Sequence, residues 1–123
     1  MTSEKLQGVL QEIADDLPGF VAAAVIDNDG VPLAGVSELD LSVPAGMFTN
    51  AWLEIKKAFE YSEWGEPAEA LFSSDEYLVV LSRIDASHYL GITVKSSANL
   101  GMVRAVRTKM LPDITEALKD ITG

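Results

Sequence analysis

The segment FVAAAVID, residues 20–27, constrains the fold more than any other part of the chain because it is apolar on both faces. Alternate residues of a β-strand point to opposite sides, so this strand must be covered twice and belongs inside a sheet. The turn-forming sequence Asn28-Asp29-Gly30 follows it, and then a second short run, residues 31–36. We therefore predict a β-hairpin, with Pro32 keeping the second strand near a sheet edge because proline lacks a backbone donor.

The acidic turn of this hairpin also has the composition of part of a calcium-binding loop. If Gly30 were the sixth position of such a loop, the first ligand would fall on Val25 and the closing glutamate on Val36, and neither valine can bind calcium. The chain has no cysteine and a single histidine, so thiolate and imidazole sites are not expected either. We predict a turn without metal, and no cofactor.

The remaining elements follow from hydrophobic periodicity. Helices are predicted over residues 3–16, 44–62 and from about 97 onward, and strands over residues 68–74, 76–84 and 88–95. Short polar separators join these last three strands, so we expect an antiparallel meander. On the second helix, the apolar stripe predicted to pack on the sheet consists of Phe48, Trp52, Ile55 and Phe59. Pro112 falls inside the last helical pattern and predicts either a kink or two consecutive helices.

The resulting order, α-β-β-α-β-β-β-α, predicts an α+β fold in which helices flank a five-stranded antiparallel sheet. At 123 residues and 13.2 kDa we expect one domain, residues 1–123. The net charge of −10 argues against nucleic acid as a partner, since phosphates would be repelled. No segment is apolar enough to insert in a membrane, and the absence of cysteine is consistent with the cytoplasm.

No catalytic constellation can be assembled from these residues. Asp85, Ser87 and His88 have the side chains of a hydrolase triad, but three residues of one tight turn diverge instead of converging on a pocket, so His88 is expected to be a surface turn residue. The glycines form no phosphate-binding loop. We predict a protein that is not an enzyme.

The element order, the hairpin GFVAAAVIDNDGVPLAG and the run YLGITVKSSANLGMVR, which includes Asn99, Leu100 and Gly101, resemble the Roadblock family of dynein light chains and their prokaryotic relatives. The segment SELDLSVPAG lacks the arginine- and threonine-rich stretch of the dynein branch, so the likeness is to the stand-alone prokaryotic type. The resemblance implies a Roadblock/profilin-like fold, a homodimer formed through the second helix and the third strand, and a role as regulator or scaffold of a Ras-like small GTPase.

The second helix has an apolar arc too wide for a single contact. Its flank of Met47, Ala51 and Ala58 suits a second copy of the same helix, because small residues allow close approach. The strand at 68–74 carries no lysine or proline in its interior, so we expect its edge to pair with another copy. The predicted dimer interface is Met47, Ala51, Ala58, Leu71 and Ser73; a broader core contact within one chain is the alternative.

On the outward face of that helix, the predicted GTPase-binding residues are Leu53, Lys56, Lys57 and Glu60. A second basic group could also form a docking site or pair locally with acidic neighbours: Lys95, Arg104, Arg107 and Lys109. The alternative function is a small-ligand sensor or a scaffold without a GTPase. A sensor would need a polar pocket, for which the sequence offers Tyr61, Tyr77, Ser82 and Tyr89.

Overall fold

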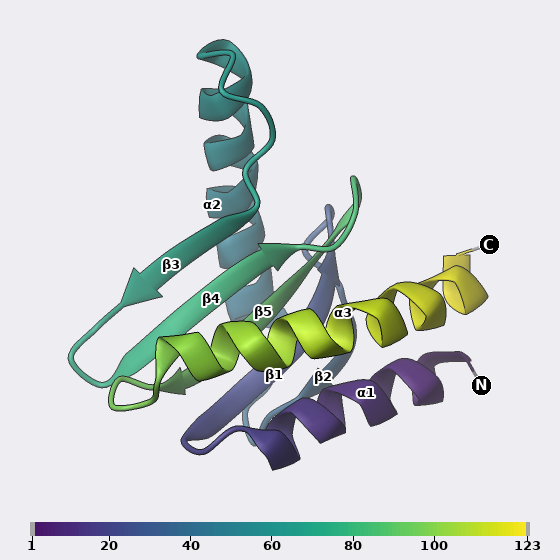
Figure 1. The fold of residues 1–123 in the computed structure, drawn as a ribbon. Helices are drawn as coiled ribbons and strands as arrows, with labels where there is room; N and C mark the ends of the chain where they lie inside the picture. The colour runs from purple at the N-terminus through teal and green to yellow at the C-terminus, as the bar shows by residue number, and fades with distance from the viewer. Residues whose placement is uncertain (1, 123) are drawn as a thin grey trace.

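The computed structural model describes the backbone of residues 2–122. Over these residues the elements run in the order α1 (Thr2–Asp16), β1 (Phe20–Asp27), β2 (Pro32–Val36), α2 (Ser42–Tyr61), β3 (Glu69–Ser73), β4 (Tyr77–Arg83), β5 (His88–Lys95) and α3 (Leu100–Thr122). This is the predicted α+β order, with boundaries that differ by a few residues (Figure 1).

The five strands form one antiparallel sheet in the order β2-β1-β5-β4-β3. The hairpin and the three-strand meander are confirmed. β1 lies between β2 and β5, as its two apolar faces predict, and β2 and β3 are the edges. Strand β5 joins the two halves, because it pairs with β1 on one side and with β4 on the other.

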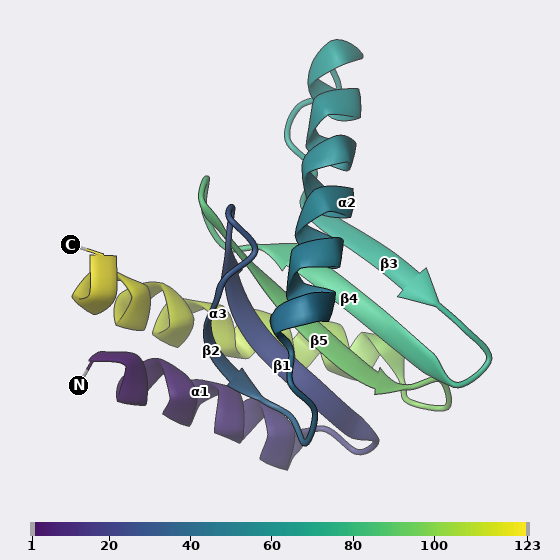
Figure 2. The same ribbon diagram turned by 180° about the vertical axis from the view of Figure 1, so that it is seen from behind.

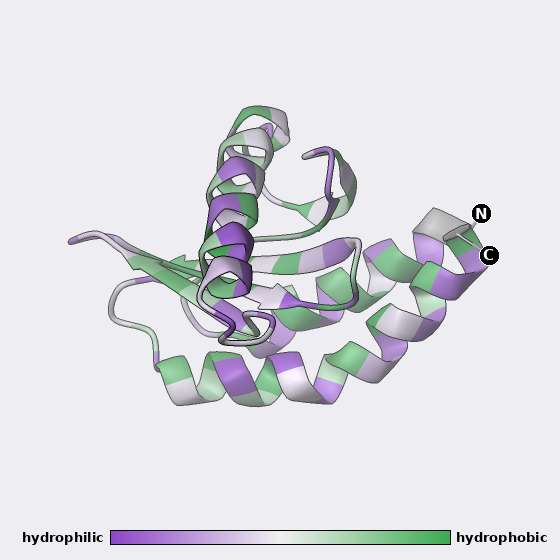
Figure 3. Cartoon of the chain, turned by 90° about the horizontal axis from the view of Figure 1, so that it is seen from above, coloured by the Kyte–Doolittle hydropathy of each residue, from purple (hydrophilic) through white to green (hydrophobic). Residues whose placement is uncertain are grey.

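Helices cover both faces of the sheet: α1 and α3 lie side by side on one face, and α2 crosses the other (Figures 1 and 2). Figure 3 shows hydrophobic residues recurring along these helices between hydrophilic ones, as expected for helices with one buried side. The side chains of each strand are divided between these two faces. Ala23 and Val25 of β1 belong to the core under α1 and α3, whereas Ala24 and Ile26 belong to the core under α2.

The core under α2 is the smaller of the two and is organised around aromatic rings. Trp52 of α2 stacks on Tyr89 of β5 with ring centroids 5.7 Å apart, and Phe48 contacts Phe72 of β3 at 5.8 Å. The C-terminal half of α2 extends past the ends of the strands (Figures 1 and 2). There Phe59 packs edge-on against Trp64 of the following loop instead of against the sheet. The predicted stripe therefore covers the sheet only in its first half.

Helix α3 continues through Pro112, so of the two predicted alternatives, a kink or two consecutive helices, the second is wrong. Proline removes only one donor from the helical ladder. Met110 and Ile114 on either side of it are buried in the main core and hold the helix in place. Asn99 begins the helix by accepting a hydrogen bond from the Met102 N–H (3.1 Å), which places the start later than predicted. None of the helices over residues 2–122 is both long and apolar enough to cross a membrane.

Candidate protein-interaction site

The acidic turn between β1 and β2 is held by its own side chain. Asp27 Oδ1 accepts hydrogen bonds from the backbone N–H groups of Asp29 (2.9 Å) and Val31 (3.0 Å), and Gly30 has a φ of 82°. The carboxylate that could have bound a metal ion is thus engaged by the turn. Among the described residues, no group of three or more histidine, cysteine, aspartate or glutamate side chains is placed to hold a metal.

His88 is not a surface turn residue, which corrects the sequence-based interpretation. It begins β5, its side chain is only 12% exposed, and its Nδ1 lies 2.8 Å from Asp85 Oδ1. Burial opposes ionisation of Asp85, but hydrogen bonds from the Ser87 N–H and from His88 outweigh it and lower the pKa of the carboxyl. Ser87 contributes its backbone and not its hydroxyl, so these three residues close a turn.

The residues predicted for the dimer flank of α2 are accessible. Met47 is 70% exposed, Ala58 is exposed and Ala51 is partly exposed. The exposed apolar side of the helix extends further in both directions than the sequence suggested, to Val43 (69% exposed) and Tyr61 (92% exposed). A signal for both was present, because they continue the three- and four-residue spacing of the flank.

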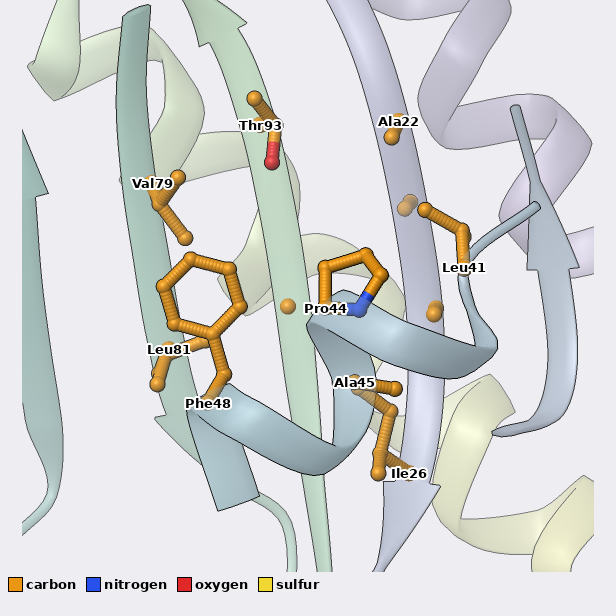
Figure 4. A pocket seen from close by; sticks show the side chains of 12 residues that line it. Ala22, Ile26, Leu41, Pro44, Ala45, Phe48, Val79, Leu81 and Thr93 are labelled. Atoms are coloured by element: carbon orange, nitrogen blue, oxygen red, sulfur yellow. The ribbon is translucent and has the colours of Figure 1, made fainter. Parts of the chain in front are cut away.

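An apolar groove lies between the first turns of α2 and the sheet (Figure 4). Pro44 and Phe48 of α2 face Val79 of β4, Thr93 of β5 and Ala22 of β1, and the volume of this open groove is about 70 Å³. The groove exists because β1 and β5 present small side chains to this face, Ala22 and Gly91 among them. It leaves part of the sheet uncovered next to the exposed side of α2.

The two predicted interface residues of β3 lie on the other face of the sheet. Glu69 of β3 bonds to arginines of α3, so its side chain lies on the α3 face of the sheet. Because strand residues alternate between faces, Leu71 and Ser73 also lie on the α3 face and not on the α2 face. Leu71 is 43% exposed there. Ala70 and Phe72 are the β3 residues that pack toward α2. The α2 flank and the β3 side chains therefore do not form one patch, and only the strand backbone links them.

The basic group near the start of α3 pairs mostly within the chain. Arg104 Nη2 donates to Glu69 Oε1 (2.6 Å), and Arg107 donates to Glu69 Oε2 and to Ser82 Oγ (3.2 Å). The hydrogen bond from Arg104 is the main reason that the pKa of Glu69 is lowered, although burial acts against it, and the same contact raises the pKa of Arg104. Lys109 lies 3.7 Å from Asp16. This arrangement favours local pairing and attaches the edge strand β3 to α3.

On the outward side of α2, Lys57 and Glu60 are exposed, and Leu53 and Lys56 are partly exposed. Lys57 Nζ pairs with Glu54 Oε1 at 3.2 Å, a contact between two largely exposed groups. Lys56 borders a surface hollow together with the acidic residues Glu60, Glu63 and Glu66. The four predicted residues thus lie on one accessible part of the helix, mixed in charge.

The polar residues proposed for a sensor pocket do not converge. Tyr89 is buried under α2, where its hydroxyl lies 2.5 Å from Thr49 Oγ1, while Ser82 is buried on the α3 side with Arg107. Tyr61 and Tyr77 are exposed. Burial raises the pKa of Tyr89 despite the hydrogen bond to Thr49, which keeps the phenol neutral. The groove of about 70 Å³ is also small beside the hundreds of cubic ångströms of typical ligand sites.

A five-stranded antiparallel sheet of this order, with two helices on one face and one on the other, is the Roadblock/LC7 fold, as the sequence resemblance predicts. Among solved structures, MglB from Myxococcus xanthus matches with a TM-score of 0.89 at 12% identity, covering 98% of this chain and 92% of that one. An MglB with a tetrameric arrangement gives 0.87 at 16% identity, covering 97% and 91%. A Roadblock/LC7 domain from Streptomyces avermitilis gives 0.84 at 13%, covering 92% and 97%. No protein-family model and no curated protein sequence matches the chain.

Proposed function

We propose that this protein is a non-enzymatic homodimer of the stand-alone prokaryotic Roadblock type, which binds a Ras-like small GTPase in the cytoplasm and modulates its nucleotide state. The observation that carries the dimer is the exposed apolar side of α2 beside an unfilled apolar groove. Val43 and Met47 are 69% and 70% exposed, and they adjoin the groove-lining residues Pro44 and Phe48. Contiguous exposed apolar surface of this kind usually marks an interface.

In the proposed dimer, α2 of each copy packs against the other through Met47, Ala51 and Ala58. The two β3 strands pair edge to edge across the same two-fold axis, with Leu71 and Ser73 meeting on the opposite face. Because β3 is an edge strand, its outward backbone groups are available for such pairing. A stable interface of this type buries about 1,200 to 2,000 Å² in total.

The paired α2 helices would present Leu53, Lys56, Lys57 and Glu60 of both copies as one surface for the GTPase. The fold it shares with MglB supports a protein partner, and the resemblance of the sequence to the Roadblock family supplies the GTPase as its class. Any effect on hydrolysis would come from ordering the GTPase's own catalytic groups, since helix α2 carries no arginine to insert.

Light scattering at micromolar concentration tests the dimer, which requires twice the chain mass of 13.2 kDa. Ala58→Glu should give a folded monomer, because it places a charge in the α2 contact. Ala105→Glu, at an exposed position of α3, is the matched control and should remain a dimer. A wild-type monomer would refute the assembly. Binding to a purified Ras-like GTPase of the same host, loaded with GDP or a GTP analogue, tests the partner separately.

A ligand sensor, the second function considered from the sequence, receives no support from the scattered positions of Tyr61, Tyr77, Ser82 and Tyr89.

A further inference from the structure

The two edge strands of the sheet differ in whether side chains form hydrogen bonds with their outward backbone groups. At the β2 edge, the side-chain amide of Gln7 in α1 makes two hydrogen bonds with a single residue. Gln7 Nε2 donates to the Gly35 carbonyl (2.5 Å), and the Gly35 N–H donates to Gln7 Oε1 (3.1 Å). At the β3 edge, no described side chain makes a hydrogen bond with the strand backbone over Glu69–Ser73.

A carboxamide carries a donor and an acceptor next to each other, as a peptide group does. Gln7 therefore occupies the place at Gly35 that the backbone of a neighbouring strand would take. Among the five residues of β2, Gly35 is the one whose backbone N–H and C=O are both bound by a described side chain.

Gln7 is held in this position by its helix. Leu6 and Leu10, on the adjoining turn of α1, are fully buried in the main core, so the backbone of α1 at residue 7 is fixed relative to the sheet. The hydrogen bonds themselves are exposed to solvent. Their net contribution to stability is therefore no more than that of an ordinary hydrogen bond. A second strand would have to displace the amide before it could pair with Gly35.

The strand best suited to pair with an open β2 edge is β2 of a second copy. The sequence of β2, PLAGV, carries no charge and no lysine, so two copies brought together around a two-fold axis would face no repulsion within the strand itself. An antiparallel pairing of identical strands is also what a two-fold axis generates.

We propose that Gln7 closes the β2 edge against a second copy of this chain and so restricts assembly through the sheet to β3. The β3 part rests on the proposed function, while the closure of β2 does not. A chain with both edges open has two separate pairing surfaces, and repeated use of both yields an open row of copies in place of a closed dimer.

The test compares Gln7→Ala with Gln11→Ala, which alters the same residue type one turn further along the same helix. Gln11 donates to Asp15 of its own helix (3.1 Å) and makes no hydrogen bond with a described residue of the sheet. Light scattering over a range of concentrations should show species larger than those of the wild type for Gln7→Ala and none for Gln11→Ala. The same distribution for Gln7→Ala and wild type would overturn the proposal.

Hydrogen exchange at the Gly35 amide provides a second measurement. It should become about fivefold faster in Gln7→Ala, the change expected when one net hydrogen bond is lost, and stay constant in Gln11→Ala. Gln7→Lys removes both bonds but places a charge at the edge, so it should show fast exchange without assembly. Assembly of Gln7→Lys as well would assign the effect to loosening of α1 and contradict the proposal. The mass of the wild-type protein, measured in the same experiment, tests the proposed β3 dimer separately from the closure of β2.

Discussion

Gly30 in the β1–β2 turn lies directly against Gly46 of α2, so that a Cβ atom on Gly30 would stand 3.0 Å from Gly46 Cα. Asn28 of the same turn donates to the Ala86 carbonyl in the β4–β5 turn (3.3 Å). The hairpin turn therefore contacts the first half of α2, and its conformation helps to determine where the helix crosses the sheet.

Gly30→Ala should cost more stability than Gly65→Ala, although both glycines have positive φ, 82° and 85°. The backbone conformation alone should cost about 1 kcal/mol at each site. A Cβ at Gly65 meets nothing within 4 Å, whereas at Gly30 it meets helix backbone that has to shift. We expect an additional loss of about 1 kcal/mol or more for Gly30→Ala, measured by urea unfolding. Equal losses would show that the contact with α2 contributes nothing.

Thr49 and Tyr89 should be energetically coupled. Both hydroxyls lie within hydrogen-bond distance of the Ala45 carbonyl, at 2.8 and 3.3 Å, as well as of each other. Thr49→Val and Tyr89→Phe should each cost about 1 kcal/mol, because a buried hydrogen bond is lost. The double variant should cost less than the sum by about 0.5 kcal/mol or more, since it leaves no hydroxyl with a missing partner. Additive losses in urea unfolding would contradict the coupling.

Glu69→Gln should destabilise the fold at neutral pH and lose this effect in acid. The pKa of Glu69 is held below its ordinary value of 4.5 by Arg104 and Arg107. A carboxyl with a lowered pKa in the folded state stabilises above its unfolded pKa, and this stabilisation disappears as pH falls through the folded pKa. At pH 7 we expect a loss of about 1 kcal/mol, because charged hydrogen bonds are removed. Thermal unfolding should show the difference from wild type shrinking below about pH 4.5.

The control for this prediction is Lys109→Met, which removes an exposed ion pair with Asp16 whose atoms are 3.7 Å apart. Pairs of this kind contribute about 0 to 1 kcal/mol, so little change is expected at either pH. A pH-independent loss in Glu69→Gln would show that packing at Glu69 matters and its charge does not.

Lys56→Glu combined with Lys57→Glu should weaken binding to the proposed Ras-like GTPase while leaving the proposed dimer and its melting temperature nearly unchanged. Lys57 is largely exposed and, among the described residues, forms an ion pair with Glu54; such exposed pairs contribute little to folding. Lys109→Glu with Lys119→Glu changes the net charge equally on α3 and serves as the control. Full binding by the α2 variant, measured by titration calorimetry, would move the docking surface elsewhere.

Much of this fold can be predicted from the sequence because the strongest signals are local. The doubly apolar β1 must be internal, and Pro32 places β2 at an edge; both are confirmed. The Glu69 contact with Arg107 joins residues 38 positions apart, and no local pattern indicates it. Whether Leu71 shares a face with α2 depends on the strand register, which the sequence pattern of a short edge strand defines weakly. The limited cover of the sheet by α2 was missed because periodicity gives the buried side of a helix but not the length over which it has a partner.

The packing of α1 against α3 has a consequence for how the chain acquires its structure. Leu10 and Ile13 of α1 are fully buried in one core with Val103 and Ile114 of α3, which lie roughly a hundred residues later in sequence. Contacts so distant along the chain are slow to form, since a long loop must be closed first. During synthesis α1 and the β1–β2 hairpin emerge long before α3. Their apolar sides stay exposed until α3 has been made. The early part of this chain is therefore the part that most needs protection from aggregation while translation continues.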